Sequence, residues 1–451
     1  MKILFVASEA TPFIATGGLG YVAGSLPRAI RNHQHACRVA LPLYSAIKPE
    51  LREKMEFVCN FYVNLGWRNQ YCGVFQANHN GVVYYFIDNE YYFKREGGIH
   101  CNDWQTAMIP VYLKVFYRQL QKFEKVKTVF TIHNIQYQGK YGMEIATDLL
   151  GLPYDAAPTM LHDGCLNMVK AAIETSDYVS TVSPTYAKEI TDPWFAHGLD
   201  PLLKANEHKL VGILNGIDTV SYNPEVDPAL YENYGPNTME KKTVNKIELQ
   251  KSMGLSQNKD ILLVGIVSRF VAHKGIDLIQ YIFEEMMTRE LQVVALGSGD
   301  YFFESFFQEM QAKYPGKMAV KVGFHPDLAR KIYAGSDVFL MPSKSEPCGL
   351  AQMVSLRYGT LPIVRETGGL KDSITDLGDD LKGNGFTFKT YNAHDMLSAI
   401  DRAAGLYDNR DLWKQAMLQG MHSDFTWKRS AGEYIRMYRE VLSEEKAVQT
   451  V

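Results

Sequence analysis

The chain alternates short apolar strands with helical segments, and this alternation dominates its first half. Residues 2–7 (KILFVA) predict a buried parallel strand, and residues 21–32 predict the helix that follows it. Further β-branched runs predict strands at 37–41, 82–87, 127–132, 178–182 and 211–214. Helical patterns lie between several of these strands, at 105–122 and 166–176. Such alternation predicts a doubly wound α/β domain on a mainly parallel sheet.

The same alternation starts again in the second half of the chain. Strands are expected at 261–267, 292–296, 318–322, 337–341 and 361–364, and helices at 275–289, 301–313 and 327–334. A chain of 451 residues is also too long for one ordinary core. The expected fold class is therefore α/β, with two Rossmann-like doubly wound domains that face each other across a cleft.

Turn signals separate the two halves. The dipeptides Asn223-Pro224, Asp227-Pro228 and Gly235-Pro236 are typical of linkers, so we expect the boundary near 222–236. The expected domains are an N-terminal domain over 1–225 and a C-terminal domain over 236–426. Residues 427–451 follow as a C-terminal helix, which we expect to pack back across the cleft.

Composition excludes several classes of protein. The net charge is −3, so the chain lacks the basic field that attracts nucleic acid. Its six cysteines are scattered without CxxC pairs, which favours reduced thiols over a disulfide framework or a zinc site. We find neither a signal peptide nor an apolar run that could span a membrane. The expected location is the cytoplasm, with no membrane partner. The oligomeric state is not predicted.

Two loops carry features that suit an anion. Thr16-Gly17-Gly18-Leu19-Gly20 lies between the first strand and the first helix, where glycines let backbone N–H groups approach a phosphate. A tight turn explains this loop equally well. Arg269 and Lys274 follow the strand at 261–267, and two cations there could neutralise a diphosphate. A solvated basic turn is the alternative.

Other polar groups follow further strands. Glu346 comes after the strand at 337–341, and Thr367-Gly368-Gly369 after the strand at 361–364. In the first half, polar residues at strand ends are Asp103, His133, Asn134 and Asn215. Ligands of open α/β sheets bind beyond the carboxyl ends of the strands, so several polar groups there favour a binding site over a structural role. Dehydrogenases and many binding proteins share this architecture, so it does not identify the chemistry.

The ordered set of motifs is more specific. The chain contains TGGLG, HNIQYQG, VSPTYAKEI, GILNGID, VSR-x4-KG, SEPCGL and LRYGTLPIVRETGGLKDSI in that order, nearly end to end. This combination resembles the bacterial-type glycogen/starch synthase family. The resemblance implies a GT-B fold and the retaining transfer of glucose from ADP-glucose to the non-reducing end of an α-1,4-glucan. It implies neither a cofactor nor a metal.

The resemblance also assigns roles, motif by motif. It implies a catalytic set formed by Glu346, His133 and Asp103. It implies that Arg269 and Lys274 hold the donor diphosphate. The donor-binding set is completed by Gly18, Asn134, Asn215, Thr367, Gly368 and Gly369.

Three departures from the family stand in the N-terminal half. The family motif is K-x-G-G-L-G-D, but this chain has Ala15 in place of the lysine and Tyr21 in place of the aspartate. The strand at 82–87 is followed almost at once by Gly97-Gly98, where the family carries an acidic, aromatic helical segment. Two alternatives to an active synthase follow: a weak or silent paralogue that binds glucan or a partner synthase, and a transferase with a different nucleotide-sugar donor.

Overall fold

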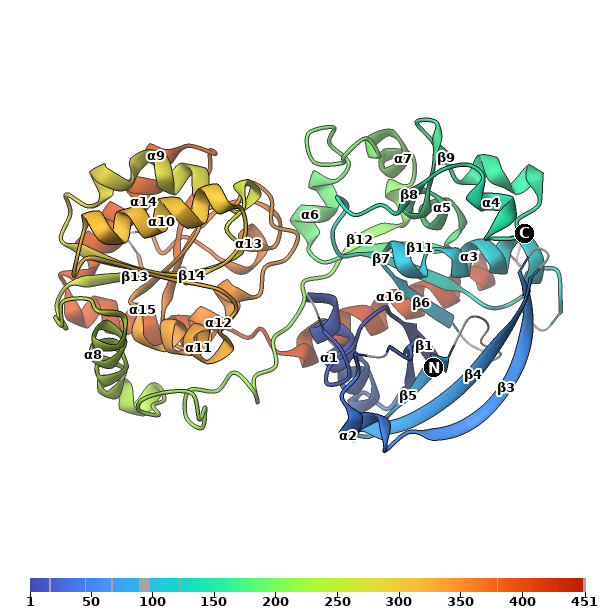
Figure 1. Cartoon of the computed structure of the whole chain (residues 1–451), viewed down its shortest axis with the longest axis horizontal. Helices are drawn as coiled ribbons and strands as arrows, with labels where there is room; N and C mark the ends of the chain where they lie inside the picture. Colours follow the sequence, from blue (N-terminus) through green and yellow to red (C-terminus); the bar gives the residue numbers. More distant parts are fainter. Residues whose placement is uncertain are drawn as a thin grey trace. The chain divides into compact units, whose positions relative to one another are not determined.

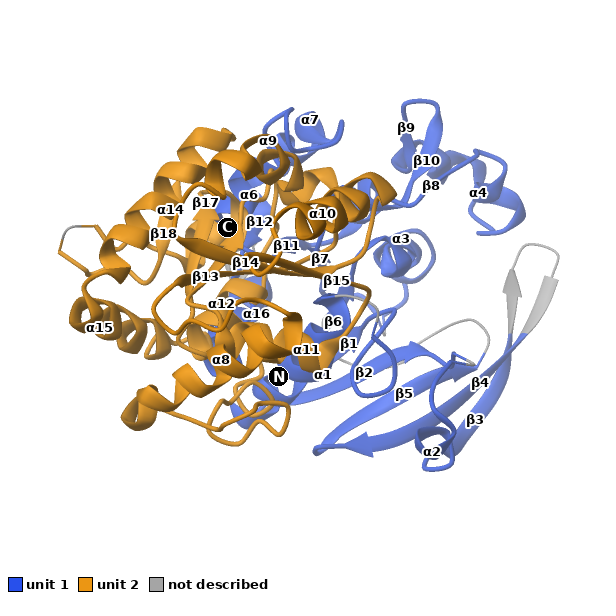
Figure 2. Cartoon of the chain, turned by 60° about the vertical axis from the view of Figure 1, so that its left-hand side comes forward, with its two compact units in different colours: residues 1–216, 427–451 blue, residues 217–426 orange. Residues whose placement is uncertain are grey.

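The computed structural model divides into two compact units. Unit 1 comprises residues 1–216 and 427–451, and unit 2 comprises residues 217–426 (Figure 2). The structure describes residues 1–15, 18–44, 46–65, 68–88, 98–121, 123–378 and 380–448. Each unit is an α/β structure around its own sheet (Figure 1).

The main sheet of unit 1 has the strand order β12-β11-β7-β6-β1-β2-β5-β4-β3. All neighbours from β12 to β5 pair in parallel, whereas β3 and β4 add an antiparallel hairpin. Its strands are β1 (Lys2–Val6), β2 (Ala36–Pro42), β3 (Glu56–Leu65), β4 (Arg68–His79), β5 (Val82–Asp88), β6 (Gly98–Asn102), β7 (Thr128–Ile132), β11 (Tyr178–Thr181) and β12 (Leu210–Gly212). A small antiparallel sheet contains β8 (Lys140–Tyr141), β9 (Leu161–His162) and β10 (Cys165–Asn167).

The longer helices of unit 1 are α1 and α16. The helices of this unit are α1 (Gly18–Asn32), α2 (Pro49–Arg52), α3 (Met108–Tyr112), α4 (Ile145–Asp148), α5 (Met168–Thr175), α6 (Pro184–Glu189), α7 (Asp200–Ala205) and α16 (Trp427–Val448). Short 3₁₀ or π segments are η1 (Trp104–Thr106), η2 (Leu113–Tyr117), η3 (Tyr154–Thr159) and η4 (Glu207–Lys209). The helical pattern expected over 105–122 is present as η1, α3 and η2, but it ends at Tyr117. The last of these segments is π-helical, because the amide of Arg118 bonds the carbonyl of Leu113 instead of a carbonyl one residue later.

The C-terminal helix α16 belongs to the core of unit 1. Its Tyr434 and Tyr438 are buried together with Leu26 and Ile30 of α1. The hydroxyl of Tyr438 lies 2.7 Å from Nδ1 of the buried His100 on β6. Each buried aromatic side chain contributes about 1.5–3 kcal/mol to stability. Helix α16 therefore packs against α1 in the core of unit 1.

The sheet of unit 2 has the parallel strand order β15-β14-β13-β16-β17-β18. Its strands are β13 (Leu262–Val267), β14 (Leu291–Gly297), β15 (Met318–Val322), β16 (Val338–Met341), β17 (Leu361–Arg365) and β18 (Phe386–Phe388). Strands β13 and β14 are almost entirely buried, as expected of a sheet that helices cover on both faces (Figure 1). The helices are α8 (Lys242–Met253), α9 (Ile276–Met286), α10 (Tyr301–Lys313), α11 (Pro326–Gly335), α12 (Ala351–Arg357), α13 (Gly368–Ser373), α14 (Ala393–Tyr407) and α15 (Arg410–Met421), with single turns η5 (Pro236–Lys241) and η6 (Ala272–Lys274).

The segment after Gly216 is anchored to unit 2. Asp227 is buried, and its carboxylate accepts hydrogen bonds from Arg330 at 2.9 Å and from the hydroxyl of Tyr358. Arg330 also donates to the carbonyl of Ser221 at 2.5 Å. These contacts explain why residues 217–225, expected from the sequence to end the N-terminal domain, group with unit 2. Among the described residues, no helix combines the length and the apolar character needed to cross a membrane.

Candidate functional site

The site of unit 2 forms where three neighbouring strands end. Strands β13, β16 and β17 are adjacent and parallel, so their carboxyl ends lie at one edge of the sheet. The loops that follow them carry, in order, Lys274, Glu346 and Thr367. The topology thus assembles three motifs that are separated by up to about a hundred residues in the chain.

A charged pair lies at the centre of this edge. The ammonium of Lys274 lies 2.6 Å from Oε2 of Glu346, and the hydroxyl of Ser343 donates to the same oxygen at 3.0 Å. The side chains are only 19% and 8% exposed. A buried ion pair is held only where its geometry and hydrogen bonds offset the loss of hydration. The pair therefore fixes a carboxylate and an ammonium in defined positions beside the strand ends.

Glycines allow the three loops to approach one another. A Cβ atom on Gly275 would lie 2.1 Å from the carbonyl oxygen of Pro342, and one on Gly368 would lie 2.0 Å from that of Glu346. Gly275 and Gly368 also have positive φ values of 77° and 44°, which favour glycine. The amide of Gly369 donates to the carbonyl of Glu346 at 3.1 Å. The TGG turn is therefore packed directly against the loop of Glu346.

A second cation, Arg269, lies near the pair, because both Arg269 and the pair act on the neighbouring His273. Arg269 is exposed, and within the described part of the chain its side chain makes no hydrogen bond or ion pair. Burial lowers the pKa of His273, and Lys274 and Arg269 lower it further, so the imidazole stays neutral near pH 7. Thr367 is buried at the start of α13. This edge of unit 2 can therefore attract an anion through Arg269 and Lys274.

Unit 1 carries a second polar cluster at the ends of β6 and β7. The backbone amide of His133 donates to Oδ1 of Asp103 at 2.8 Å, and Nε2 of His133 lies 2.9 Å from Oδ1 of Asn102. Because Nδ2 of Asn102 donates to the carbonyl of Val6, its Oδ1 must accept from His133. A neutral His133 then carries its proton on Nε2 and presents the lone pair of Nδ1.

Burial moves both ionisable groups of this cluster toward their neutral forms. It raises the pKa of Asp103, although His133 and two backbone amides oppose this shift. It lowers the pKa of His133, against the opposing effect of Asp103 and Glu9. Asp103 also has a φ of 57°, a strained value for a residue other than glycine. The cluster is suited to hydrogen bonding with neutral hydroxyl groups.

The sequence does not single out Glu9, which the structure places in this cluster. Oε1 of Glu9 accepts a hydrogen bond from the amide of Gly20 at 3.0 Å, and its charge raises the pKa of Asp103 and His133. A Cβ on Gly20 would lie 2.5 Å from Cβ of Ala15, so this turn is tightly packed. An acidic residue three positions after the first strand is the sequence signal that could have indicated Glu9.

The remaining predicted residues of unit 1 differ in their surroundings. Gly18 begins α1, whereas Thr16 and Gly17 lie outside the described residues. Oδ1 of Asn134 accepts from the amide of Gln136 at 3.0 Å, a local turn contact. Asn215 is buried, and its Oδ1 has no hydrogen-bond partner among the described residues. An unpaired buried carbonyl of this kind indicates a place where a ligand could donate.

The departures expected from the sequence are only partly described. Ala15 is exposed, and Tyr21 on α1 is 46% exposed. The shortened segment after β5 falls on residues 89–97, which lie outside the described residues. In the part of the chain that is described, no three His, Cys, Asp or Glu side chains are grouped to hold a metal ion.

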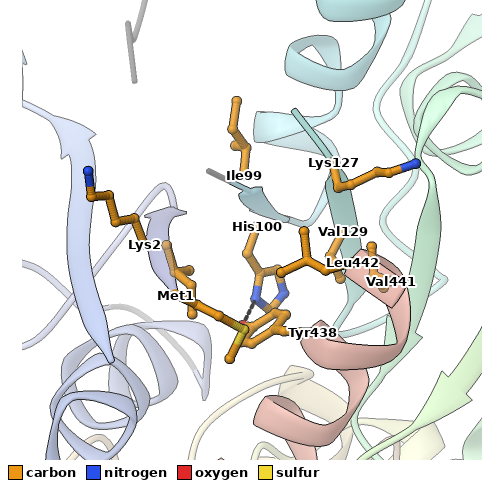
Figure 3. A pocket seen from close by; sticks show the side chains of 10 residues that line it. Met1, Lys2, Ile99, His100, Lys127, Val129, Tyr438, Val441 and Leu442 are labelled. Atoms are coloured by element: carbon orange, nitrogen blue, oxygen red, sulfur yellow. Dashed lines mark hydrogen bonds between the residues drawn. The ribbon is translucent and has the colours of Figure 1, made fainter. Parts of the chain in front are cut away.

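A small pocket of unit 1 is separate from these clusters. It lies at the amino-terminal ends of β1, β6 and β7 and is lined mainly by apolar side chains, with His100 and Tyr438 at its base (Figure 3). None of the predicted site residues lines it. The Asp103–His133 cluster lies at the carboxyl ends of β6 and β7, whereas the pocket lies at their amino-terminal ends, so the pocket is not part of that cluster.

Comparisons with known proteins agree with one another. The family model "Starch synthase catalytic domain" matches residues 2–99 and 98–205, and "Glycosyl transferases group 1" matches residues 246–417. The glycogen synthases of Geobacillus thermodenitrificans and Geobacillus stearothermophilus are 46% and 45% identical over 479 aligned residues, with 99% of each chain covered. The match to the starch synthase model is interrupted at residues 98–99. The alignment with the Geobacillus thermodenitrificans enzyme is 479 residues long, whereas this chain has 451 residues.

A solved structure shows the same architecture. The catalytic domain of starch synthase IV from Arabidopsis thaliana, bound to ADP and acarbose, superposes with a TM-score of 0.87 at 29% identity. The match covers 98% of this chain and 99% of that one. The expected GT-B fold with two Rossmann-like domains is therefore confirmed. On these grounds, the chain belongs to the glycogen/starch synthase family of hexosyltransferases.

Proposed function

We propose that this chain transfers glucose from ADP-glucose to the non-reducing end of an α-1,4-glucan with retention of configuration, in the cytoplasm and without a metal or cofactor. The observation that carries the proposal is the Lys274–Glu346 pair, which lies 2.6 Å apart at the strand ends of unit 2. The ADP in the plant starch synthase structure supports an adenine nucleotide as the donor. The names of the bacterial relatives support glycogen as the product.

The proposed roles follow from the charge that develops during glycosyl transfer. The transition state is positive at the sugar and negative on the departing oxygen. Lys274 and Arg269 would stabilise the departing diphosphate, and the carboxylate of Glu346 would favour the positive sugar. The amides of Gly368 and Gly369, with Thr367, would contact the sugar and the phosphate. These residues would act by fixed electrostatics, since none of them needs to change its charge.

The cluster of unit 1 would hold the neutral part of the substrates. Asp103 and the Nδ1 lone pair of His133 can accept hydrogen bonds from sugar hydroxyls. Asn134 and the unpaired Oδ1 of Asn215 would add further contacts to the sugar. Gly18, at the start of α1, would lie on the phosphate side of the donor.

Release of nucleotide from ADP-glucose and from UDP-glucose, each with and without glycogen, tests this proposal. We expect ADP release that requires glycogen, persists in EDTA and exceeds UDP release. NMR of the first product should show an α-linkage. Protein that is folded by circular dichroism but releases no ADP above a Glu346→Gln control would overturn the proposal. Preferred turnover of UDP-glucose would overturn the choice of donor.

A further inference from the structure

Tyr391 contacts the segment that carries Lys274. Tyr391 lies between β18 and α14, where it is partly buried. Its hydroxyl donates to Oδ1 of Asp277 at 2.5 Å and lies 3.3 Å from the carbonyl of Ala272. Asp277 stands in the first turn of α9, and Ala272 begins the turn η6 that ends at Lys274. The single proton of this hydroxyl is donated to Asp277, and the oxygen also contacts the backbone at Ala272, so Tyr391 touches the chain on both sides of Lys274.

The ring of Tyr391 contacts the loop that carries Glu346. The guanidinium of Arg365 lies 5.7 Å from the ring centroid, and the ammonium of Lys344 lies 5.8 Å from it. Both distances are within the range of a cation–π interaction. Arg365 in turn donates to the carbonyls of Ser343 at 2.9 Å and Lys344 at 2.5 Å. These carbonyls belong to the loop whose Ser343 hydroxyl bonds Glu346.

Tyr391 thus joins the two segments that form the Lys274–Glu346 pair. We propose that Tyr391 is a positioning residue. It holds the ammonium of Lys274 and the carboxylate of Glu346 at the relative positions that the donor diphosphate requires. This inference rests on the proposed function of the pair. The backbone contact between Lys344 and His273, at 2.9 Å, joins the same two segments directly. Removing the hydroxyl of Tyr391 should therefore loosen the relative positions of Lys274 and Glu346 without separating the two segments.

The charge of the Asp277 carboxylate strengthens its hydrogen bond with the hydroxyl of Tyr391. Burial and the neighbouring carboxylate of Asp277 both raise the pKa of Tyr391, so its hydroxyl remains a donor at neutral pH. A hydrogen bond to a charged acceptor is roughly twice as strong as a neutral one. Phenylalanine would keep the ring near Arg365 and Lys344 and would lose only the hydrogen bond to Asp277 of α9. The Tyr391→Phe variant therefore isolates the contact on which the inference depends.

Steady-state kinetics and ADP titration calorimetry on the full chain test the inference. For Tyr391→Phe we expect kcat to fall and the Kd of ADP to rise, each about 3- to 10-fold. This is less than a full hydrogen bond to a charged group contributes, because the contact between Lys344 and His273 still joins the two segments. Asp277→Ala should have the same effect, and the double variant should be no worse than either single one. Tyr281→Phe, on an exposed tyrosine of the same helix, should change neither value.

The outcomes separate this inference from the proposed function. Values of kcat and of the Kd of ADP within twofold of wild type in Tyr391→Phe would overturn the positioning role. A lower Tm with unchanged kcat at 25 °C would also overturn it, because it would show a purely structural contact. If the wild type transferred no glucose but Tyr391→Phe still weakened ADP binding, the proposed function would fail and the positioning of the pair would stand.

Discussion

The central pair of the unit 2 site differs from the central pair of the unit 1 cluster. In unit 2, Lys274 and Glu346 form an ion pair at 2.6 Å in a nearly buried place. In unit 1, burial moves the pKa of Asp103 up and that of His133 down, so both groups are biased toward neutrality. The difference indicates a division of work in which unit 2 presents fixed charge and unit 1 presents hydrogen bonds. Both departures described by the structure, Ala15 and Tyr21, fall in unit 1.

The largest effect is expected from Glu346→Gln. This change removes the carboxylate while keeping its shape, and we expect turnover to fall by about 100-fold or more, as for the loss of one preorganised electrostatic contact. Lys274 then lacks its partner, so the melting temperature should also fall by a few degrees. Transfer of labelled glucose to glycogen measures the first effect and calorimetry the second. Glu284→Gln, at an exposed surface pair, serves as the control. Turnover close to that of wild type would contradict the catalytic role of Glu346.

A smaller effect is expected from Arg269→Ala. Its exposed guanidinium can form a charged hydrogen bond to the donor diphosphate, which contributes about 1.5–3 kcal/mol. The KM for ADP-glucose should therefore rise by about one to two decades, with no loss of stability. The matched control is Lys382→Ala, because Lys382 is 84% exposed and pairs with Asp380 on the surface of the same unit. Equal KM values for both variants would contradict the assignment of Arg269 to the donor.

Acid should destabilise unit 1 through His100. Burial lowers the pKa of His100 to about 3 in the folded chain, from a usual value of 6.5. Below pH 6.5 the unfolded chain binds a proton that the folded chain does not, so stability falls as the pH falls toward 3, by up to about 1.4 kcal/mol per pH unit. His133 acts in the same direction, and the raised pKa of Asp103 acts in the opposite one.

Urea unfolding at pH 7 and pH 5.5 tests this linkage. The wild type should lose about 1 kcal/mol between the two values through His100 alone. His100→Gln should show a smaller difference between the two pH values, although it will be less stable at both, because it loses the bond to Tyr438. His208→Gln, at an exposed histidine of the same unit, should retain the wild-type difference. An unchanged difference in His100→Gln would show that another group is responsible.

The smallest effect is expected from restoring the family lysine. Ala15 is exposed beside the glycine turn, and Ala15→Lys would add a cation there. We expect the KM for ADP-glucose to fall about threefold, less than a full charged hydrogen bond would provide. Ala15→Met adds length without charge and should leave KM unchanged. A higher KM in Ala15→Lys would show that unit 1 has adapted to the absence of the lysine.

Sequence patterns predicted the regular part of the fold well. The strand at 318–322 and the helix at 301–313 have the predicted bounds, because a short apolar run indicates the strand and the spacing of Phe303, Phe306 and Phe307 indicates the helix. The hairpin β3–β4 and the short β18 were not predicted. Much of β3 is exposed on both faces, so its sequence (EFVCNFYVNL) lacks the alternation of a half-buried strand, and β18 has only three residues.

The candidate site was predictable in its motifs but not in its contacts. The motif order indicated Lys274, Glu346 and the TGG turn, and the adjacent strands of unit 2 bring these three together. No sequence spacing could show that Tyr391 reaches Asp277, because they are 114 residues apart and belong to no shared motif. Contacts of this kind depend on loop geometry, which local patterns do not encode.

The most direct test of the division between the units is ADP titration calorimetry with one variant from each. Lys274→Met removes the charge from unit 2, and His133→Phe removes the hydrogen-bonding ring from unit 1. The account predicts that Lys274→Met weakens ADP binding by about tenfold or more, that His133→Phe leaves it within twofold of wild type, and that both variants lose glucose transfer. If His133→Phe weakened ADP binding as much as Lys274→Met, the hydrogen-bonding ring of unit 1 would hold ADP as strongly as the fixed charge of unit 2, and the central claim would be contradicted.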